Sequence, residues 1–268
     1  MKIGIIGMGH VGNITRELII KNCEISEYDK KDNNPFDYNK FVGCEYIIVC
    51  VDTPCDSCGD ADLSNVEDVF KLIHKMSIPI VLRSTVSPGT TELLQNKYKI
   101  PIAFWPEYIG ETSFLIDTWE RLSHEQPFVI LGTNNLVFDK FIDFLALIYG
   151  PMCKFLTISP TAAEIVKYME NAYFAVKVTF VNEFREICEA FNVRWQDVRE
   201  GWLLDPRIER DHSDAFANNR GFAGKCLPKD LSAIIQAVRK KGISPTLLEA
   251  TMSVSYTHLR AHETCADL

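Results

Sequence analysis

Short apolar runs alternate with helix-like patterns along the first part of the chain. The runs that predict strands span residues 2–6, 24–28, 45–51, 78–83, 101–104, 127–132 and 153–157. Between several of them, residues 63–76 and 90–97 repeat apolar side chains at the spacing of a helix that buries one face. This alternation is typical of an α/β fold with a parallel sheet and crossover helices. The short connection over residues 30–44 contains Pro35, so no full helix is expected there.

A different pattern begins at Pro160, a residue that suits the first turn of a helix. Apolar residues then surround most of the circumference from residue 161 to about 191, which predicts one long helix buried on several sides. Further helices are expected at residues 195–201, 230–240 and 245–253. We therefore expect a Rossmann-type doubly wound parallel sheet over residues 1–157 and an all-helical central domain over 158–253. The helical pattern breaks at residue 255, which predicts a disordered or foreign tail over 254–268.

Composition narrows the classes of protein to which the chain could belong. Its 268 residues are 47% hydrophobic and 24% charged, the profile of a globular protein with a real core. The net charge of -8 argues against a nucleic-acid partner. No apolar run reaches the length of about 18 residues that a membrane span needs, so no membrane partner is expected. The cysteine usage is typical of the cytoplasm, where we expect the protein to be.

Cysteine usage agrees with a reducing compartment. The 9 cysteines follow no framework spacing, and several lie inside apolar runs, as Cys50 does. Cys55 and Cys58 form one C-x-x-C pair in a polar loop. A zinc or redox role is the less favoured interpretation of this pair, because no second pair follows, and no metal site is predicted.

A glycine-rich motif follows the first strand and opens a helix, which is the context that dinucleotide binding requires. The glycines allow a tight turn, a close approach of the backbone to a diphosphate, and close packing of helix on strand. The residues expected to bind the cofactor here are Gly7, Gly9, His10, Val11 and Gly12. Asp29 ends the second strand, where an acid binds ribose hydroxyls and favours NAD over NADP. The alternative is a glycine-rich turn beside a surface acid.

A second motif places Cys226 behind a glycine-rich turn and just before Pro228, which suits a helix start. A helix N-terminus and Lys229 would both lower the pKa of the thiol and favour its nucleophilic thiolate. Asp230 follows Cys226 by four positions, so one helical turn could bring its carboxylate near the sulfur. The alternative is a buried structural cysteine.

Polar residues elsewhere suggest further parts of a site. Lys167 and Asn171 share one face of the long helix and could stabilise an oxyanion, although an ordinary polar stripe is the commoner case. Thr85, Glu107 and Glu111 follow predicted strands, at the sheet edge where α/β proteins bind ligands. The two glutamates could instead be acids at helix starts.

Taken together and in this order, these motifs resemble the UDP-glucose/GDP-mannose dehydrogenase family from residue 2 to about 249. The markers lie at residues 7–12, 51–54, 62–64, 84–90, 106–108, 164–171, 182–183, 205–208 and 221–230. The resemblance implies an NAD-dependent enzyme that oxidises a nucleotide sugar, UDP-glucose first among them, at C6 to the uronic acid for polysaccharide biosynthesis. In that scheme Cys226 captures the intermediate aldehyde as a thiohemiacetal, and a second oxidation gives a thioester that water hydrolyses.

The resemblance also implies roles for individual residues. Lys167 and Asn171 would steady the oxyanion, while Asp230, Thr85 and Glu107 would position water and move protons. Further cofactor contacts are implied for Thr53, Pro54, Thr85, Glu111 and Lys229, and substrate contacts for Glu107, Lys167, Asn171, Arg207, Phe222, Ala223 and Gly224. A homodimer formed through the long helix is expected.

The sequence departs from the family at several positions. Ala223 stands where the family has a third glycine, and Trp105 replaces the usual asparagine. Residues 255–268 match nothing in the family, and the usual C-terminal nucleotide-binding domain is absent, which suggests a short form. Two alternatives stay open: a β-hydroxyacid-type NAD dehydrogenase, which needs no cysteine, and a catalytically dead NAD-binding dimer.

Overall fold

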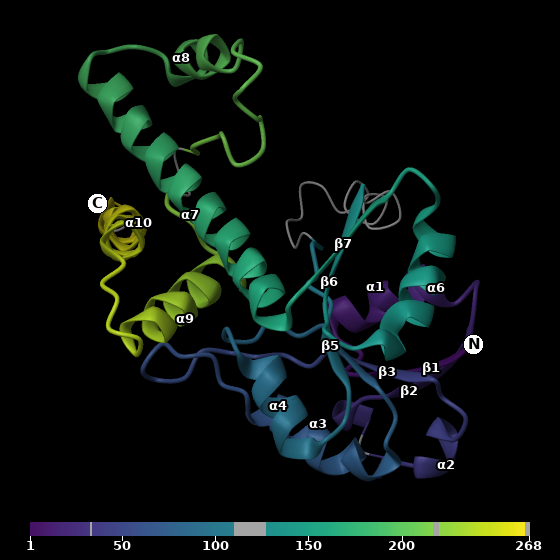
Figure 1. The fold of residues 1–268 in the computed structure, drawn as a ribbon. Coiled ribbons are helices and arrows are strands. Elements are labelled where there is room, and N and C mark those ends of the chain that lie inside the picture. Colours follow the sequence, from purple (N-terminus) through teal and green to yellow (C-terminus); the bar gives the residue numbers. More distant parts are fainter. Residues whose placement is uncertain (33, 110–126, 217–219, 266–268) are drawn as a thin grey trace. The chain divides into compact units, whose positions relative to one another are not determined.

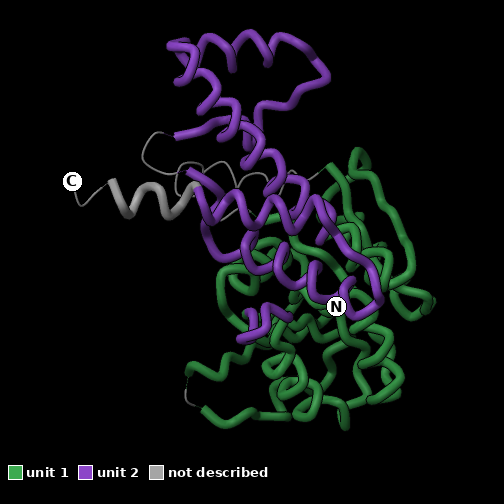
Figure 2. Tube along the Cα trace, turned by 90° about the vertical axis from the view of Figure 1, so that its left-hand side faces the viewer, with its two compact units in different colours: residues 1–54, 61–167 green, residues 55–60, 168–268 purple. Residues whose placement is uncertain are grey.

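The computed structural model describes residues 1–32, 34–109, 127–216 and 220–265, with side chains up to residue 257. The chain forms two compact units (Figure 2): residues 1–54 with 61–167, and residues 55–60 with 168–268. This division differs from the expected one in two places. The first two turns of the long helix belong to the first unit, and the loop 55–60 belongs to the second.

The first unit is built on a seven-stranded sheet with the order β2-β1-β3-β4-β5-β6-β7. The strands are β1 Lys2–Ile6, β2 Glu24–Tyr28, β3 Tyr46–Val49, β4 Ile80–Leu82, β5 Ile102–Phe104, β6 Phe128–Gly132 and β7 Lys154–Ile158. All seven match the predicted strands within a few residues. Strands β1 to β5 pair in parallel, whereas β5 and β6 pair antiparallel, so β6 and β7 run opposite to the others. The prediction of a parallel sheet is therefore wrong for these two strands, because the apolar pattern of a strand is the same in either direction.

Helices cover both faces of this sheet (Figure 1). The helices are α1 His10–Ile19, α2 Tyr38–Phe41, α3 Ser64–Ile73, α4 Thr90–Tyr98 and α6 Asp139–Tyr149, with 3₁₀ turns η1 Lys30–Asp32, η2 His74–Met76 and η4 Leu136–Phe138. Leu18 of α1 and Phe141 of α6 pack into one buried cluster with the sheet. Phe70 of α3 and Leu94 of α4 pack into another, on the opposite face. The doubly wound class is confirmed.

The strand order places a switch point between β1 and β3. The chain goes from β1 to β2 on one side and then crosses to β3 on the other side of β1. In such sheets the carboxyl ends of the two central strands frame the ligand crevice. In the described part of the connection from β2 to β3, which leaves out residue 33, the helical elements are η1 and the four residues of α2, in agreement with the expectation that no full helix forms around Pro35.

The second unit is helical. Its helices are the larger part of α7 Pro160–Ala190, α8 Trp195–Trp202, α9 Leu227–Arg239 and α10 Thr246–Cys265. Val181, Cys188, Trp195 and Ala215 form a small core. Helix α9 contacts α10. None of the helices in the described residues is long and apolar enough to cross a bilayer.

The long helix is buried on several sides, as expected: Ala163, Tyr168 and Ala175 are each at most 1% exposed. One stripe of it stays exposed, with Met169 at 72% and Tyr173 at 54%. One expectation for the helical part is wrong, because the helical pattern does not break at residue 255 and α10 continues to Cys265. This last stretch lacks an apolar period, but it contains the good helix formers Leu259, Arg260 and Ala261, and such residues sustain a helix without periodicity.

Candidate functional site

The loop between β1 and α1 is shaped for close approach of a ligand. Gly7 has φ +93°, and a Cβ there would lie 2.8 Å from the backbone of Cys50, while a Cβ at Gly12 would lie 1.9 Å from the Gly7 carbonyl oxygen. Both positions therefore require glycine for the protein's own packing. A Cβ at Gly9 would meet no atom within 4 Å, so the space beside this residue is open.

The N-terminus of α1 faces the same loop. Gly9 is its N-cap residue, no side chain caps the helix, and the first turn, which begins with His10 and Val11, contains no acid. The unsatisfied N–H groups and the helix dipole favour an anion at such an end. An open space beside Gly9 and an uncapped helix start fit the diphosphate of a dinucleotide.

Asp29 lies directly after β2 and turns toward this loop. Its Oδ2 accepts a hydrogen bond from the Met8 N–H at 2.6 Å, and its Oδ1 accepts one from the Lys31 N–H at 2.8 Å. The carboxylate thus stands beside the glycine-rich loop, in the position from which an acid reaches the ribose of a bound dinucleotide. The sequence-based assignment of Asp29 to the cofactor site stays a prediction, with this geometry in its favour.

The loops after β3 and β4 are joined by hydrogen bonds. The Thr53 hydroxyl donates to the Thr85 carbonyl oxygen at 2.6 Å, and the Ser84 hydroxyl donates to the Val51 carbonyl oxygen at 2.6 Å. Thr53, which precedes Pro54, is buried. These bonds fix Thr53 and Thr85 relative to each other at the carboxyl edge of the sheet, where their side chains were expected to serve a ligand.

Glu107 and Lys167 form a buried ion pair in the first unit. Their Oε1 and Nζ atoms lie 3.5 Å apart, and the Ile109 N–H donates to Glu107 Oε2 at 2.7 Å. Burial raises the pKa of Glu107, but Lys167, the Ile109 N–H and Arg83 together outweigh it, so the pKa lies below its ordinary value. Glu107 is therefore an anion in this setting and can accept a proton.

Arg83, which the sequence reading missed, lies beside this pair. Its side chain is buried, and its Cζ lies 3.6 Å from the centroid of the Trp105 ring. Nε and Nη1 have no hydrogen-bond partner among the described residues. The stacking explains why tryptophan stands at position 105, since an aromatic face stabilises a guanidinium. The sequence signal that could have indicated Arg83 is a charged residue at the end of an apolar strand.

Glu164 links α7 to α4. Its carboxylate accepts hydrogen bonds from the Gly89 N–H, the Thr91 N–H and the Thr91 hydroxyl, at 2.5, 2.8 and 2.6 Å. These donors belong to the start of α4, whose N-cap Gly89 has no side chain to supply a bond. Glu164 opens the family marker at residues 164–171, and no role was predicted for it from the sequence.

In the second unit, polar side chains gather at the start of α9. Cys226 is the N-cap residue of this helix, and Pro228 occupies its first turn, as predicted. Asp230 is buried, and its Oδ2 accepts a hydrogen bond from Asn171 Nδ2 at 2.6 Å. Lys229 Nζ lies 2.6 Å from Asp230 Oδ1. Asn171 is thus tied to the helix that begins at Cys226.

The turn before Cys226 tolerates its departure from the family pattern. Gly221 and Gly224 have positive φ values of 78° and 89°, whereas Ala223 does not and is exposed. A methyl group at position 223 therefore causes no backbone strain. Phe222 is buried, and its N–H donates to the Ser255 hydroxyl at 3.0 Å.

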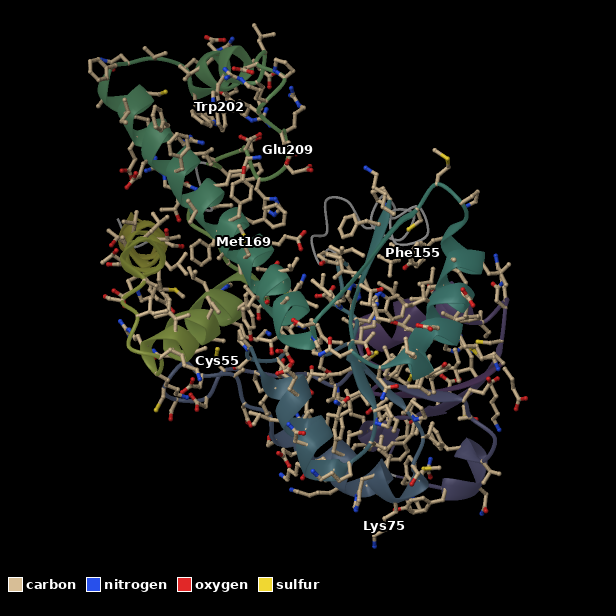
Figure 3. The ribbon with its side chains drawn as sticks, in the orientation of Figure 1. Cys55, Lys75, Phe155, Met169, Trp202 and Glu209 are labelled. Carbon is tan, nitrogen blue, oxygen red and sulfur yellow. The ribbon has the colours of Figure 1, made fainter. Side chains whose placement is uncertain are left out.

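Arg207 lies in another part of the second unit. Its guanidinium pairs with the Asp205 carboxylate, and it lines a pocket with Tyr173 and Lys177. Lys177 Nζ donates to the Glu209 carbonyl oxygen at 2.7 Å; Figure 3 labels Glu209 on its loop.

The predicted site residues thus form one set in each unit. Thr53, Thr85, Glu107, Lys167 and the glycine-rich loop belong to the first, and Asn171, Arg207, Cys226 and Asp230 to the second. Lys167 and Asn171 are one turn apart on α7. Glu111 lies outside the described residues. Within the described chain, no group of three or more His, Cys, Asp or Glu side chains is arranged to hold a metal ion.

Two family models match the chain. The model described as "UDP-glucose/GDP-mannose dehydrogenase family, NAD binding domain" matches residues 30–149, and that of the same family's central domain matches residues 161–256. A relative named UDP-glucose 6-dehydrogenase, from Rickettsia prowazekii (strain Madrid E), is 31% identical over 227 residues, which are 80% of this chain and 50% of the relative. The chain therefore spans about half the length of that curated relative.

Two solved structures share the fold. A UDP-glucose dehydrogenase from the archaeon Pyrobaculum islandicum has a TM-score of 0.82 at 22% identity, with 96% of this chain and 68% of that chain covered. The 3-hydroxyisobutyrate dehydrogenase of Mycobacterium tuberculosis has a TM-score of 0.70 at 13% identity, with 97% of this chain and 94% of that chain covered.

Proposed function

The chain belongs to the UDP-glucose/GDP-mannose dehydrogenase family, and we propose that it oxidises the C6 hydroxyl of a nucleotide sugar, UDP-glucose first among the candidates, to a carboxylate. The observation that carries this proposal is the start of α9, where Cys226 is the N-cap residue and Asp230 accepts a hydrogen bond from Asn171. An oxidation that stopped at the aldehyde would have no use for a thiol at this position. Oxidation to the acid requires covalent capture of the aldehyde, and a thiolate supplies it.

The cofactor is NAD, and the residues of the glycine-rich loop and Asp29 would hold it. When bound, NAD would supply the hydride acceptor for the two oxidation steps. The protein contributes the open backbone at Gly9 and the uncapped start of α1, which suit a diphosphate. The Asp29 carboxylate suits the ribose hydroxyls.

Cys226 acts as the nucleophile in the proposed reaction. Its sulfur adds to the C6 aldehyde to give a thiohemiacetal, whose oxidation leaves a thioester that water hydrolyses to the acid and the thiol. The N-terminal end of α9 favours negative charge at this sulfur. Asp230, one helical turn after Cys226, accepts and returns protons in this scheme, and its carboxylate contacts Asn171 and Lys229.

Four further residues interact with the oxygen atoms of the substrate and of the attacking water in the proposed reaction: Lys167, Asn171, Glu107 and Thr85. The Lys167 ammonium stabilises the oxyanion that develops at C6, and Asn171, one turn further along α7, donates a second hydrogen bond. Glu107 positions the attacking water by accepting a hydrogen bond from it, because Lys167 and Arg83 keep this carboxylate ionised despite burial. Thr85, fixed by Thr53, orients the same water.

We further propose that the protein acts as a homodimer formed through α7. Apolar side chains on this helix stay exposed within one chain, with Met169 at 72% and Tyr173 at 54% (Figure 3 labels Met169). Exposed apolar surface of this kind marks an interaction site, and a second copy of the helix has the matching character. The cytoplasm is the expected compartment, because a reducing environment keeps Cys226 available.

The first experiment counts NADH formed per sugar consumed. The purified protein is mixed with NAD and UDP-glucose, beside a Cys226→Ser variant. Two NADH per sugar for the unaltered protein, with loss or stalling in the variant, is the expected result. If NAD binds but no nucleotide sugar is turned over, the chain is an NAD-binding protein without this activity. UDP-N-acetylhexosamines and GDP-mannose serve as the further substrates in that comparison.

The second candidate is a β-hydroxyacid dehydrogenase. The observation in its favour is the match over nearly the whole length of both chains to the mycobacterial 3-hydroxyisobutyrate dehydrogenase. That chemistry stops at the carbonyl and gives one NADH per substrate without covalent capture. A Cys226→Ser variant with undiminished turnover of a 3-hydroxy acid would select it.

A further inference from the structure

We propose that Cys55 and Cys58 form a reversible disulfide, a redox site of the second unit that is separate from the nucleophile Cys226. Both are thiols in the structure and belong to the loop 55–60. Within the described residues, the pair belongs to no group of three or more His, Cys, Asp or Glu side chains arranged to hold a metal ion. Two thiols three residues apart can instead join as a disulfide.

Hydrogen bonds close the loop that contains the two cysteines. The Gly59 N–H donates to the Asp56 carbonyl oxygen at 3.1 Å, and the N–H groups of Cys58 and Asp60 both donate to Asp56 Oδ1, at 2.8 and 3.0 Å. The Cys55 sulfur lies 3.7 Å from the carbonyl oxygen of Gly59, the residue next to Cys58. Residues three apart in a closed turn can approach to the Cα separation of about 4.4–6.8 Å that a disulfide spans.

The two thiols differ in a way that suits thiol–disulfide exchange. Cys58 is exposed, whereas Cys55 is half-buried and donates to the Lys229 carbonyl oxygen at 3.4 Å (Figure 3 labels Cys55). Burial raises the pKa of Cys55, which keeps it protonated at rest. Cys58 is therefore the sulfur that an oxidant meets first, and Cys55 is the resolving thiol.

The oxidant is a low-molecular-weight disulfide such as glutathione disulfide. The Cys58 thiolate attacks one sulfur of the oxidant, the S–S bond breaks, and one glutathione thiolate leaves. Cys55 loses its proton to that thiolate and attacks the Cys58 sulfur, which releases the second glutathione. Two thiols of the protein are oxidised and one glutathione disulfide is reduced to two thiols, so atoms and electrons balance.

Formation of the disulfide changes the contacts between the loop 55–60 and α9. The loop is held on this helix by the Ser232 hydroxyl, which donates to the Gly59 carbonyl oxygen at 2.9 Å, and by the ion pair of Lys240 with Asp60 at 2.8 Å. A disulfide sulfur has no proton, so oxidation removes the hydrogen bond from Cys55 to Lys229 in the first turn of α9. Because Cys226 is the N-cap residue of this helix, oxidation is expected to lower turnover severalfold. This consequence rests on the proposed function, whereas disulfide formation does not.

The sequence allows a sharp test of the bond. A protease that cleaves before aspartate cuts at Asp52, Asp56 and Asp60, which releases residues 52–55 and 56–59 as separate peptides with one cysteine each. After the intact protein is equilibrated in oxidised glutathione, these peptides are expected as one linked species in a non-reducing digest. Dithiothreitol should separate them. In reduced glutathione the link should be absent.

Variants distinguish the possible outcomes. Cys58→Ser removes the link and leaves Cys55 its hydrogen bond, while Cys153→Ser, which alters a partly exposed thiol outside the loop, should leave the link in place. Two unlinked peptides at every glutathione ratio, or either peptide linked to the one that contains Cys226, would overturn the proposal. NADH production that falls in oxidised glutathione and survives in Cys58→Ser would support the effect on α9. Linked peptides without NADH production in any condition would leave the redox site standing and contradict the proposed function instead.

Discussion

At the scale of single residues, the partners of the buried charged groups could not be predicted from the sequence. Glu164 is fully buried, yet its carboxylate satisfies three donors at the start of α4. Arg83 is buried against Trp105, and the Glu107–Lys167 pair lies in the same unit. A buried charge costs several kcal/mol unless it is paired, so each of these groups depends on neighbours that are distant in sequence.

Glu164 gives stability a pH dependence that can be measured. Burial raises its pKa from 4.5 to about 7, although the Thr91 and Gly89 donors oppose the shift. The folded protein therefore holds this proton more tightly than the unfolded chain does. The stabilisation is complete below pH 4.5 and is lost as the pH rises toward 7, by roughly 3 kcal/mol.

A Glu164→Gln variant removes this titration. In urea unfolding between pH 4.5 and 8, the free energy of unfolding of the unaltered protein is expected to fall relative to the variant as the pH rises. Glu17→Gln, on the exposed face of α1, is the matched control and should show no such trend. A constant difference between the unaltered protein and Glu164→Gln at every pH would contradict the prediction.

At the scale of elements, two glycines at the start of α1 serve different purposes: one allows close packing, and the other leaves space for a ligand. A side chain at Gly12 would collide with the Gly7 carbonyl oxygen, whereas one at Gly9 would enter open space. A change of Gly12 to alanine therefore affects the packing of the fold. A change of Gly9 to alanine affects the ligand that binds beside the loop.

Two alanine variants test this separation. Gly12→Ala is expected to destabilise the protein by about 1–3 kcal/mol, because α1 must move away from β1. Gly9→Ala should leave stability within about 0.5 kcal/mol, since nothing in the protein occupies the space. It should nevertheless weaken NAD by about tenfold or more, measured by calorimetric titration, if the diphosphate passes there. Unchanged NAD affinity in Gly9→Ala would place the diphosphate elsewhere.

At the scale of the whole molecule, the long helix α7 has more apolar surface than one chain covers. Met169 and Tyr173 are one turn apart and exposed. A Met169→Glu variant is expected to raise the dimer dissociation constant by about tenfold or more, because it puts a charge into an apolar interface. Light scattering over a dilution series measures it, with Gln196→Glu, an exposed polar change on α8, as the control. An unaltered protein that is monomeric at micromolar concentration would refute the dimer.

The sequence by itself determined the elements and the chemistry of the candidate groups. Strand and helix periods are local, so β1 and β2 were predicted to the residue and α7 to within one. The glycine motif and the Cys226 segment are also local, since their spacing reflects one loop and one helix start. The order of the motifs identified the family.

Only the tertiary structure decided the features that depend on distant partners. The sense of β6 and β7, the three donors to Glu164, the stacking of Arg83 on Trp105 and the loop of Cys55 against α9 all join residues far apart in sequence. A period of apolar residues shows which face of an element is buried but not against what. Contacts between distant residues depend on how the elements pack in three dimensions. This packing is determined by the whole sequence and not by any local pattern.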